Sequence, residues 1–284
     1  MIKEYSVLMS VYYKDKPEYL KMAIESMLNQ TIMPEQYIIV EDGWLPENLN
    51  KIINEYCNKY QKNVHGVDFF TIVKIQENKG LANALNEGLK VSRNELVARM
   101  DADDISLPQR CEKEMELFEK ESQLEICGCN IAEFYGTPDN IKTYRIVPSE
   151  YDNIKKFMKR RTPFNHPTVM YKKSSVLKNG GYSVEIMRKQ DYDLFSRMIV
   201  NGVYARNVNE TLFLFRADEN NYARRKSLIN LKNAFKVYWR HYKRGGCSIM
   251  DFALMTSGEI IFFIAPIQIM KFLSDKYLRK VSDD

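Results

Sequence analysis

The sequence has few cysteines and no apolar run long enough to cross a membrane, and each shortage excludes a class of protein. Its five cysteines are odd in number and none are spaced as a CxxC pair. Neither a disulfide framework nor a cysteine zinc site is therefore expected. The strongly apolar run IIFFIAPIQIM has only 11 residues and contains a proline, whereas a helix that spans a bilayer needs about 20.

The N-terminus also lacks a secretory signal. The opening residues, MIKEYSVLMSVYYKDKPEYL, show no basic segment followed by an apolar one, so we expect the chain to stay in the cytoplasm. With 284 residues, of which 45% are hydrophobic and 28% charged, the chain is long enough to bury a sizeable core. The composition predicts a globular protein.

Positive charge is concentrated near the C-terminus. Residues 1–220 carry 30 Lys and Arg against 32 Asp and Glu, whereas residues 221–284 carry 12 against 5. The segment SLINLKNAFKVYWRHYKRGG interleaves basic, aliphatic and aromatic residues, as does an amphipathic helix that lies in a lipid interface. We expect residues 227–280 to dock on the anionic inner leaflet of the membrane, and this local, aliphatic-rich surface does not favour nucleic acid as a partner.

An alternative for the same segment is a helical cap. In that arrangement the apolar FFIAP stretch (262–266) is buried against the rest of the chain or against a second subunit of a homo-oligomer. The two alternatives differ in whether the apolar side chains are covered by protein or by lipid.

Strand and helix patterns alternate through the first hundred residues. Apolar runs typical of buried strands occur at 5–11, 36–42, 69–76 and 95–100. Apolar residues at helical spacing fill the intervals between them, and the first of these helices begins behind Pro17. Such alternation is typical of an α/β fold, with a Rossmann-like, mainly parallel sheet flanked by helices on both faces.

Acidic side chains follow two of these strands. EDG (41–43) ends the second strand, and DADD (101–104) follows the fourth. Ligands of open α/β sheets bind beyond the carboxyl ends of the strands, so we expect the two clusters to share one crevice. Asp101 and Asp103 are separated by one residue and offer the hard oxygen ligands that Mg²⁺ or Mn²⁺ prefers.

An alternative interpretation assigns part of this cluster to helix capping. Asp104 or Ser106 is placed to cap a helix that begins near Pro108. Both interpretations hold together if Asp104 is a cap or a supporting residue, while Asp101 and Asp103 form the site.

Four segments in this order resemble the signatures of the family-two inverting glycosyltransferases, which have the GT-A fold and use nucleotide-diphosphate sugars. They are YSVLMSVYYKDKPEYLKMAIESMLNQT, YIIVEDG, ENKGLANALNEGLKVSRNELVARMDADDISLPQR and QDYDLFSRMIVNG. The resemblance covers residues 5–216. It implies a GT-A domain over 1–220, with a nucleotide-binding half at about 1–105 and an acceptor half at about 106–220, followed by a basic, apolar helical tail at 221–284.

The resemblance implies that the donor is held at the ends of the strands. A carboxylate such as that of Asp42 can accept the imide N–H of uracil. Asp103 and Asp101 are the implied ligands of Mn²⁺ or Mg²⁺, a metal that would act as a Lewis acid on the departing nucleoside diphosphate. The full set of implied donor contacts in the first half of the chain is Ser10, Val11, Tyr12, Asp42, Lys79, Gly80, Asp101, Ala102 and Asp103.

The QDYDLFSRMIVNG segment (190–202) supplies the implied catalytic base. The family usually has Glu-Asp here, with the second acid as base, and this chain has Gln190-Asp191. Asp191 matches the second acid of the pattern and is therefore the implied base, whereas Gln190 departs from the pattern. The reaction needs a base because a sugar hydroxyl is a poor nucleophile until it loses its proton. The alternative role of Asp191 is to cap the helix that begins there, and Asp193 is expected at the surface of the first turn.

Two more positions come from the NHPTVMYKKSSVLKNGGY segment (165–182) and the tail. This segment resembles the branch that builds bacterial capsule and O-antigen repeat units. In that branch the position of His166 lies near the donor phosphates and the acceptor, and the alternative is a structural histidine before proline. Arg224, together with Arg225, is placed to close over the diphosphate on a loop, or else is part of the basic tail.

The resemblance implies transfer of a hexose from a UDP-sugar, with inversion, to a saccharide linked to undecaprenyl diphosphate. From the branch we expect galactose, with GlcNAc or GalNAc as alternatives. A different class of function is a nucleotide-binding scaffold that has lost its chemistry and only assembles the polysaccharide machinery. Retention of Asp42, Asp101, Asp103 and Asp191 favours the enzyme.

Overall fold

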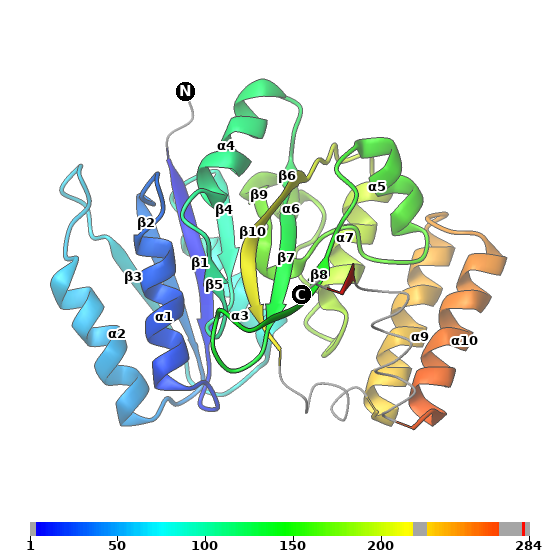
Figure 1. Cartoon of the computed structure of the whole chain (residues 1–284), viewed down its shortest axis with the longest axis horizontal. Helices are drawn as coiled ribbons and strands as arrows, with labels where there is room; N and C mark the ends of the chain where they lie inside the picture. The colour runs from blue at the N-terminus through cyan, green and yellow to red at the C-terminus, as the bar shows by residue number, and fades with distance from the viewer. Residues whose placement is uncertain (1–3, 218–225, 267–279, 282–284) are drawn as a thin grey trace.

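The computed structural model describes residues 4–217, 226–266 and 280–281, and arranges them as two β-sheets with helices packed around them (Figure 1). The strands are β1 (Tyr5–Val11), β2 (Gln36–Asp42), β3 (Phe70–Ile75), β4 (Leu96–Met100), β5 (Ile105–Ser106), β6 (Ile126–Cys127), β7 (Cys129–Phe134), β8 (Ile141–Arg145), β9 (Met170–Lys172), β10 (Val208–Arg216) and β11 (Lys280–Val281). The helices are α1 (Pro17–Leu28), α2 (Glu47–Lys59), α3 (Leu81–Val91), α4 (Arg110–Lys120), α5 (Tyr151–Met158), the 3₁₀ turn η1 (His166–Thr168), α6 (Lys173–Lys178), α7 (Gln190–Val200), α9 (Leu228–Lys243) and α10 (Ile249–Ile264).

The first sheet has the strand order β3-β2-β1-β4-β9-β6. Strands β1 to β4 are parallel. Beyond β4 the sheet is extended by β9, which runs antiparallel to β4, and by β6, which runs antiparallel to β9. Because helices cover both faces, β2 is buried along its whole length, as expected for a strand in the middle of a parallel sheet. The predicted α/β architecture is confirmed, and the four predicted strands and three predicted helices of the first hundred residues are all present.

Alternate residues of one strand feed two separate hydrophobic cores. Val7 and Met9 of β1 point into the core on the side of α1, α2 and α4. Leu8, between them, points into the core on the side of α3 and α7. This two-residue period is that of any β-strand. It leaves the strand ends, and not the strand faces, as the place where polar side chains reach a ligand.

The second sheet was not anticipated from the sequence. It has the order β11-β8-β7-β10-β5, and β10 runs parallel to β7 with two shifts of register. Apart from the consecutive β7 and β8, its strands are separated in sequence by helices and by strands of the first sheet, so no local period reveals their pairing. Strand β5 directly follows the DADD segment and pairs with β10. The second sheet therefore holds the C-terminal end of that segment in place.

The C-terminal helices α9 and α10 form a hairpin at the end of the molecule opposite α2 (Figure 1). Ser227 caps α9 by accepting a hydrogen bond from the Asn230 backbone at 3.1 Å, and Ser248 and Asp251 form a capping box at the start of α10. The inner face of α9 packs into the core beside α7, through Ala234, Val237 and Tyr238. None of the helices in the described ranges combines the length and apolarity needed to cross a bilayer.

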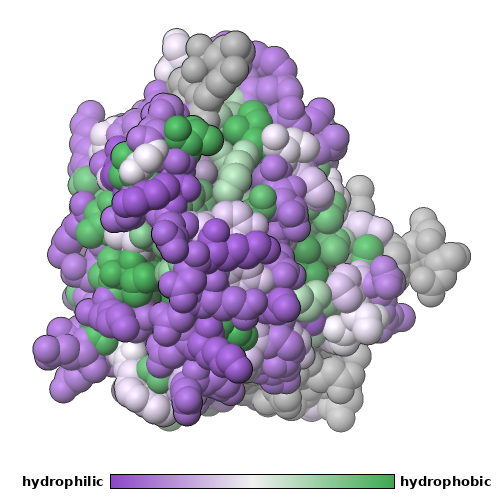
Figure 2. Space-filling view, turned by 90° about the vertical axis from the view of Figure 1, so that its left-hand side faces the viewer, coloured by the Kyte–Doolittle hydropathy of each residue, from purple (hydrophilic) through white to green (hydrophobic). Residues whose placement is uncertain are grey.

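The outer face of the hairpin is apolar. The exposed large hydrophobic residues on it are Leu228, Ile229, Phe235, Trp239, Ile249, Met250, Leu254, Ile260, Ile261 and Ile264. By contrast, the opposite end of the molecule, around α2 and β3, is mostly hydrophilic and has its hydrophobic residues in separate patches (Figure 2). The FFIAP stretch is not buried: its Ile264 is 71% exposed. Phe262, Phe263 and Ala265 are half-buried, so the chain itself covers the stretch only in part. Burial against a second subunit stays an alternative.

Candidate active site

The candidate site lies at the carboxyl ends of β1, β2 and β4. In the sheet register Ser10 is opposite Val40, and Met9 is opposite Met100. The segments that follow these strands therefore lie side by side. Strand β1 sits between β2 and β4, so the chain leaves the sheet in opposite directions at this point. A crevice at such a switch point is where open α/β sheets bind their ligands.

The first wall of the crevice comes from β1 and the residues after it. The side chain of Val11 is fully buried, so only its backbone is available to a ligand, whereas Tyr12 is exposed. The Tyr12 backbone N–H donates to Asp15 Oδ2 at 2.9 Å and ties the loop into a turn. Ser10 is half-buried at the end of β1. The three residues predicted at this position thus line one edge of the crevice.

Asp42 ends β2 and holds the loop before α3. Its two carboxylate oxygens accept the backbone N–H groups of Lys79, at 2.8 Å, and Gly80, at 2.9 Å. Asn78 closes the arrangement by donating to the Asp42 carbonyl at 3.1 Å. Gly80 adopts φ of +85°, a left-handed conformation that favours glycine. The structure thus brings together the three predicted residues, and each Asp42 oxygen keeps one lone pair for a ligand.

The DADD segment follows β4 and forms an acidic cluster. Carboxylate oxygens of Asp101, Asp103 and Asp104 lie within 4.8 Å of one another. Asp101 is half-buried, Asp103 is exposed, Asp104 is fully buried, and Ala102 is buried between the first two. Neither Asp104 nor Ser106 caps α4, whose N-cap is Gln109 and has no side-chain cap bond. The capping interpretation is wrong because β5 separates the cluster from the helix.

Two arginines that sequence reasoning missed hold this cluster together. Arg99, within β4, pairs with Asp101 although it is only 1% exposed. Arg216, at the end of β10, donates its Nε to the Asp103 carbonyl at 2.8 Å, and its backbone N–H to Asp104 Oδ1 at 2.8 Å. Arg99 could have been found from the sequence, because a charged residue in the otherwise apolar strand LVARM indicates a buried charge that needs a partner. The signal for Arg216 is non-local, since it lies in the other sheet.

Repulsion within the cluster is only partly relieved by these arginines. Dehydration, followed by the charge of Asp101, raises the pKa of Asp103 to about 6. Burial, followed by the charges of Asp103 and Asp101, raises the pKa of Asp104 well above its ordinary value. Asp15 belongs to the same electrostatic neighbourhood: burial is the main cause that raises its pKa to about 7, and Asp103 and Asp101 add to it.

The cluster fits a divalent cation. Asp104 Oδ2 is buried and has no hydrogen-bond partner among the described residues, and the nearby carboxylates are oxygen donors of the kind that Mg²⁺ and Mn²⁺ take. A cation there would offset the repulsion that raises the pKa values of the cluster. Asp103 and Asp101 present the accessible oxygens, because Asp104 is fully enclosed.

Asp191 is the second residue of α7 and is half-buried. The helix N-cap is Lys189, so the alternative in which Asp191 itself caps the helix is wrong. Its carboxylate makes no hydrogen bond or ion pair with the described residues. It lies close enough to the hydroxyl of Tyr182 for its charge to add, after burial and Tyr171, to the raised pKa of that phenol. An unpaired carboxylate at a helix N-terminus is available to accept a proton from a ligand.

His166 connects the two halves of the site. Its Nε2 lies 3.0 Å from the Tyr182 hydroxyl, and its ring packs against Phe195 of α7. Burial, with the nearby positive charge of Arg99, lowers the pKa of His166 well below its ordinary value, so the ring is neutral near pH 7. His166 thus lies at hydrogen-bond distance from Tyr182 and within the electrostatic influence of Arg99, the partner of Asp101. Arg224, predicted over the diphosphate, lies outside the described residues.

Comparison with known proteins decides the family. The sequence pattern of Glycosyl transferase family 2 matches residues 6–213, most of the chain.

The chain belongs to glycosyl transferase family 2.

Relatives of this family 2 enzyme match it over nearly their whole length. It is 33% identical over 281 residues to an uncharacterized glycosyltransferase of Haemophilus influenzae, covering 98% of this chain and 100% of that protein. It is 30% identical over 277 residues to the UDP-Gal:alpha-D-GlcNAc-diphosphoundecaprenol beta-1,3-galactosyltransferase of Escherichia coli, covering 98% of this chain and 97% of that protein. The α9–α10 hairpin therefore lies within the matched part of both relatives.

Solved structures confirm the GT-A fold. The mannosyltransferase of Pyrobaculum calidifontis, in complex with GDP-Man and Mn²⁺, superposes with a TM-score of 0.64 at 13% identity, over 92% of this chain and 70% of that one. Residues 1–349 of Staphylococcus aureus TarS, in complex with UDP-GlcNAc, superpose with a TM-score of 0.62 at 14% identity, over 83% and 65% of the two chains. At these identities the likeness concerns the fold.

The family 2 chain differs from the sequence-based expectation at Asp193. This residue is fully buried and accepts hydrogen bonds from Ser183, at 2.6 Å, and from Arg197 and Arg244, at 3.2 and 3.0 Å. The prediction of a surface residue is wrong because α9 packs against α7, a long-range contact that the local pattern does not reveal. Asp193 is an anchor between α7 and the C-terminal hairpin.

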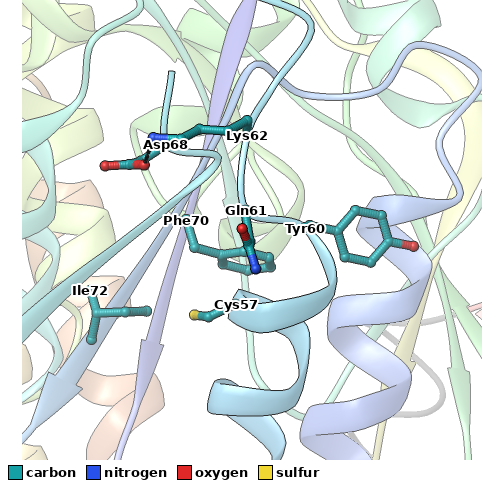
Figure 3. Close-up of a pocket in the computed structure, with 7 residues that line it drawn as sticks. All are labelled: Cys57, Tyr60, Gln61, Lys62, Asp68, Phe70 and Ile72. Carbon is teal, nitrogen blue, oxygen red and sulfur yellow. Dashed lines mark hydrogen bonds and ion pairs between the residues drawn. The ribbon is translucent and has the colours of Figure 1, made fainter. Parts of the chain in front are cut away.

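A pocket elsewhere on the enzyme is no part of this site. It has a volume of about 460 Å³ and is lined by residues of α2, β3 and the loop between them (Figure 3). One wall is the exposed ion pair of Lys62 and Asp68. The pocket lies toward the start of β3, at Phe70, whereas Asp42 pairs with Ile75 at the other end of that strand. It is thus at the wrong edge of the sheet for the candidate chemistry.

Proposed function

We propose that this family 2 enzyme transfers a hexose, galactose first among the candidates, from a UDP-sugar to a saccharide linked through diphosphate to a polyprenol lipid, with inversion. Such a reaction belongs to the synthesis of capsule, O-antigen or exopolysaccharide. The observation that carries the assignment is the similarity to the E. coli galactosyltransferase over 98% of this chain and 97% of that protein. The amylovoran biosynthesis glycosyltransferase AmsE of Erwinia amylovora, 28% identical over 272 residues, supports the same class.

The site supports this reaction through residues at the strand ends. The backbone after β1 and the free lone pairs of Asp42 are suited to hold a uracil ring. Asp101 and Asp103 are suited to hold a divalent cation. When bound, Mn²⁺ or Mg²⁺ supplies Lewis-acid stabilisation of the charge on the departing diphosphate.

Asp191 supplies the base in this proposal. Inversion requires a single displacement, in which the acceptor hydroxyl attacks the anomeric carbon from the face opposite to the departing diphosphate. The hydroxyl becomes a competent nucleophile as its proton passes to a carboxylate. Asp191 is half-buried, and its carboxylate makes no hydrogen bond with the described residues. Its charge acts on the Tyr182 hydroxyl, which lies 3.0 Å from His166 Nε2.

A transfer assay tests the function directly. The full chain is incubated with Mn²⁺, a synthetic GlcNAc-diphospho-lipid and, one at a time, UDP-galactose, UDP-glucose, UDP-GlcNAc and UDP-GalNAc. We expect a galactosylated product whose new bond is β, as read from the anomeric proton coupling, because the donor is α-configured. A product with another sugar corrects only the donor, and an α-linked product contradicts inversion. Absence of any product with every donor favours the scaffold alternative.

We further propose that the hairpin docks on the cytoplasmic membrane surface, where the lipid-linked acceptor resides. Its outer face combines the exposed apolar side chains with exposed Lys232 and Lys243. Aliphatic and aromatic side chains favour the acyl boundary, and lysines favour anionic headgroups. Lys236 and Arg240, also on α9, instead form ion pairs with Glu185.

Vesicle flotation tests the docking. The double variant Leu254→Glu, Ile261→Glu places charge on the exposed face of α10 without disturbing buried residues, and it should lose co-flotation with anionic phosphatidylglycerol vesicles. The matched control, Val64→Glu with Val67→Glu, changes exposed residues at the other end of the molecule and should float like the parent chain. Removing the hairpin altogether is a poorer test, since α9 covers buried parts of α7. Equal flotation of all three proteins contradicts the proposal.

A further inference from the structure

Lys189, two residues before the candidate base, has an unusual backbone. In the described part of the chain, Lys189 is the one non-glycine residue with a positive φ, at 62°. A lysine pays a steric penalty in the left-handed region that a glycine would avoid. Such a conformation persists where surrounding contacts impose it, and these places are often functional. The side chain of Lys189 is therefore expected to make contacts that hold it there.

Those contacts reach both helices of the C-terminal hairpin. Lys189 Nζ donates to Tyr238 of α9 at 2.9 Å and to Glu259 of α10 at 2.6 Å. The Tyr238 hydroxyl donates to the same Glu259 oxygen at 2.8 Å. Three side chains from three elements thus form a closed triangle, half-shielded from solvent. Hydrogen bonds that join an ammonium to a carboxylate are among the stronger ones in proteins.

Lys189, one corner of this triangle, is two residues before Asp191. The backbone carbonyl of Lys189 accepts the N–H of Asp193 at 3.0 Å, so Lys189 is part of the first turn of α7. Asp193 is in turn bonded to Arg244, just after α9, at 3.0 Å, and the Tyr192 ring packs edge-on against Tyr238 at 5.5 Å between centroids. Lys189, Tyr192 and Asp193 of this turn are thus each tied to the hairpin or to the residue that follows α9.

Asp191 has no such anchor of its own, since its carboxylate makes no hydrogen bond with the described residues. Its position is set by the backbone of the turn that carries it. We propose that Lys189, held by Tyr238 and Glu259, is a positioning residue for Asp191, and that the α9–α10 hairpin thereby completes the acceptor half of the active site. This inference rests on the proposed function, in which Asp191 receives the proton of the acceptor.

Substitution of Lys189 separates positioning from folding. Lys189→Met keeps most of the stem and removes the ammonium. We expect kcat to fall between ~10- and ~100-fold, the effect of a reacting group displaced by about 1 Å, while KM for the UDP-sugar changes less than about twofold because the donor is bound at the strand ends. Lys189→Arg should recover part of kcat, because a guanidinium can still pair with Glu259.

Lys189→Gly gives the sharpest contrast. Glycine relieves the strain of the positive φ but also breaks the triangle. The Tm of Lys189→Gly should therefore equal or exceed that of Lys189→Met, while its kcat stays as low. The control Lys236→Met removes a lysine of the same hairpin, on its exposed side, and should transfer sugar normally. If Lys189→Met does not fold, Glu259→Gln and Tyr238→Phe carry the same test from the other corners of the triangle.

The possible outcomes distinguish this inference from the proposed function. Unchanged kcat in Lys189→Met, Lys189→Gly and Glu259→Gln, with normal transfer by the parent chain, overturns the positioning role alone. Absence of transfer by the parent chain overturns the proposed function instead. A double variant, Lys189→Met with Glu259→Gln, should be no slower than the slower single variant, because both substitutions break one interaction; losses that multiply contradict the inference.

Discussion

Replacing Asp191 by Asn should lower the rate of sugar transfer by roughly 10²- to 10⁴-fold, the usual contribution of a positioned general base. The amide keeps the shape of the side chain but accepts no proton. UDP affinity in Mn²⁺ should be unchanged, because the nucleotide is proposed to bind at the ends of β1, β2 and β4 and not at α7. The Tm should fall only slightly, since the one lost interaction is that of a negative charge with the helix N-terminus.

The control for this variant follows from the structure. Asp193 is unsuitable, because it is fully buried and bonded to Ser183, Arg197 and Arg244. Asp152, on α5, pairs only with Lys155 and has 80% of its side chain exposed, so Asp152→Asn should transfer sugar at the parent rate. Near-normal transfer by Asp191→Asn would show that Asp191 is not the base, and His166 would be the next candidate. Asp104 is enclosed and cannot reach an acceptor hydroxyl.

Replacing Asp103 by Ala should reduce transfer by at least ~10²-fold, because a metal ligand that stabilises the departing diphosphate is worth several kcal/mol in the transition state. UDP binding measured by calorimetry should weaken strongly in Mn²⁺ and little in EDTA. The fold should survive, since Asp103 is exposed and Arg216 bonds to its backbone carbonyl, which alanine retains. Without metal, the Tm should equal or exceed that of the parent, as one repelling charge has been removed.

Asp152→Ala is again the matched control, and it should bind UDP like the parent in both conditions. Two results would contradict the account of the acidic cluster. One is full activity of the parent chain in EDTA. The other is equal UDP affinity of Asp103→Ala and the parent in Mn²⁺.

The parts of the fold and site that are local in sequence were predictable. Each of the strands β1 to β4 is an apolar run, and each of the first three helices has an apolar stripe. Asp42 ends β2, and Asp101 and Asp103 lie in the segment that follows β4. Parallel strands place their carboxyl ends at one edge, so the shared crevice follows from the alternation alone. Asp191 came from the resemblance to the family, and its carboxylate makes no hydrogen bond or ion pair with the residues that the structure describes.

The parts that depend on distant residues were not predictable. Arg216 meets Asp104 only because β10 and β5 pair in the second sheet. Asp193 is buried only because α9 folds back over α7. The triangle of Lys189, Tyr238 and Glu259 joins three segments far apart in the chain. In each case the local pattern of charges was compatible with a solvated surface, and long-range packing decided otherwise.

The proposed division of the chain into a GT-A domain over 1–220 and a tail over 221–284 stays a prediction, since residues 218–225 lie outside the described ranges. The contacts of α9 nevertheless give the hairpin two faces with different roles. Its inner face packs on α7 and ties the turn that carries Asp191. Its outer face is the proposed membrane surface.

The central claim is that the acidic cluster after β4 holds the metal of a nucleotide-sugar transferase beside the uncommitted Asp191. The most direct measurement is an anomalous difference map from crystals of the full chain grown with Mn²⁺ and UDP. The account predicts a manganese peak within ligand distance of Asp103, with UDP phosphate oxygens on its other side and the uracil next to Asp42. A manganese peak elsewhere, or UDP bound away from the ends of β1, β2 and β4, would contradict it.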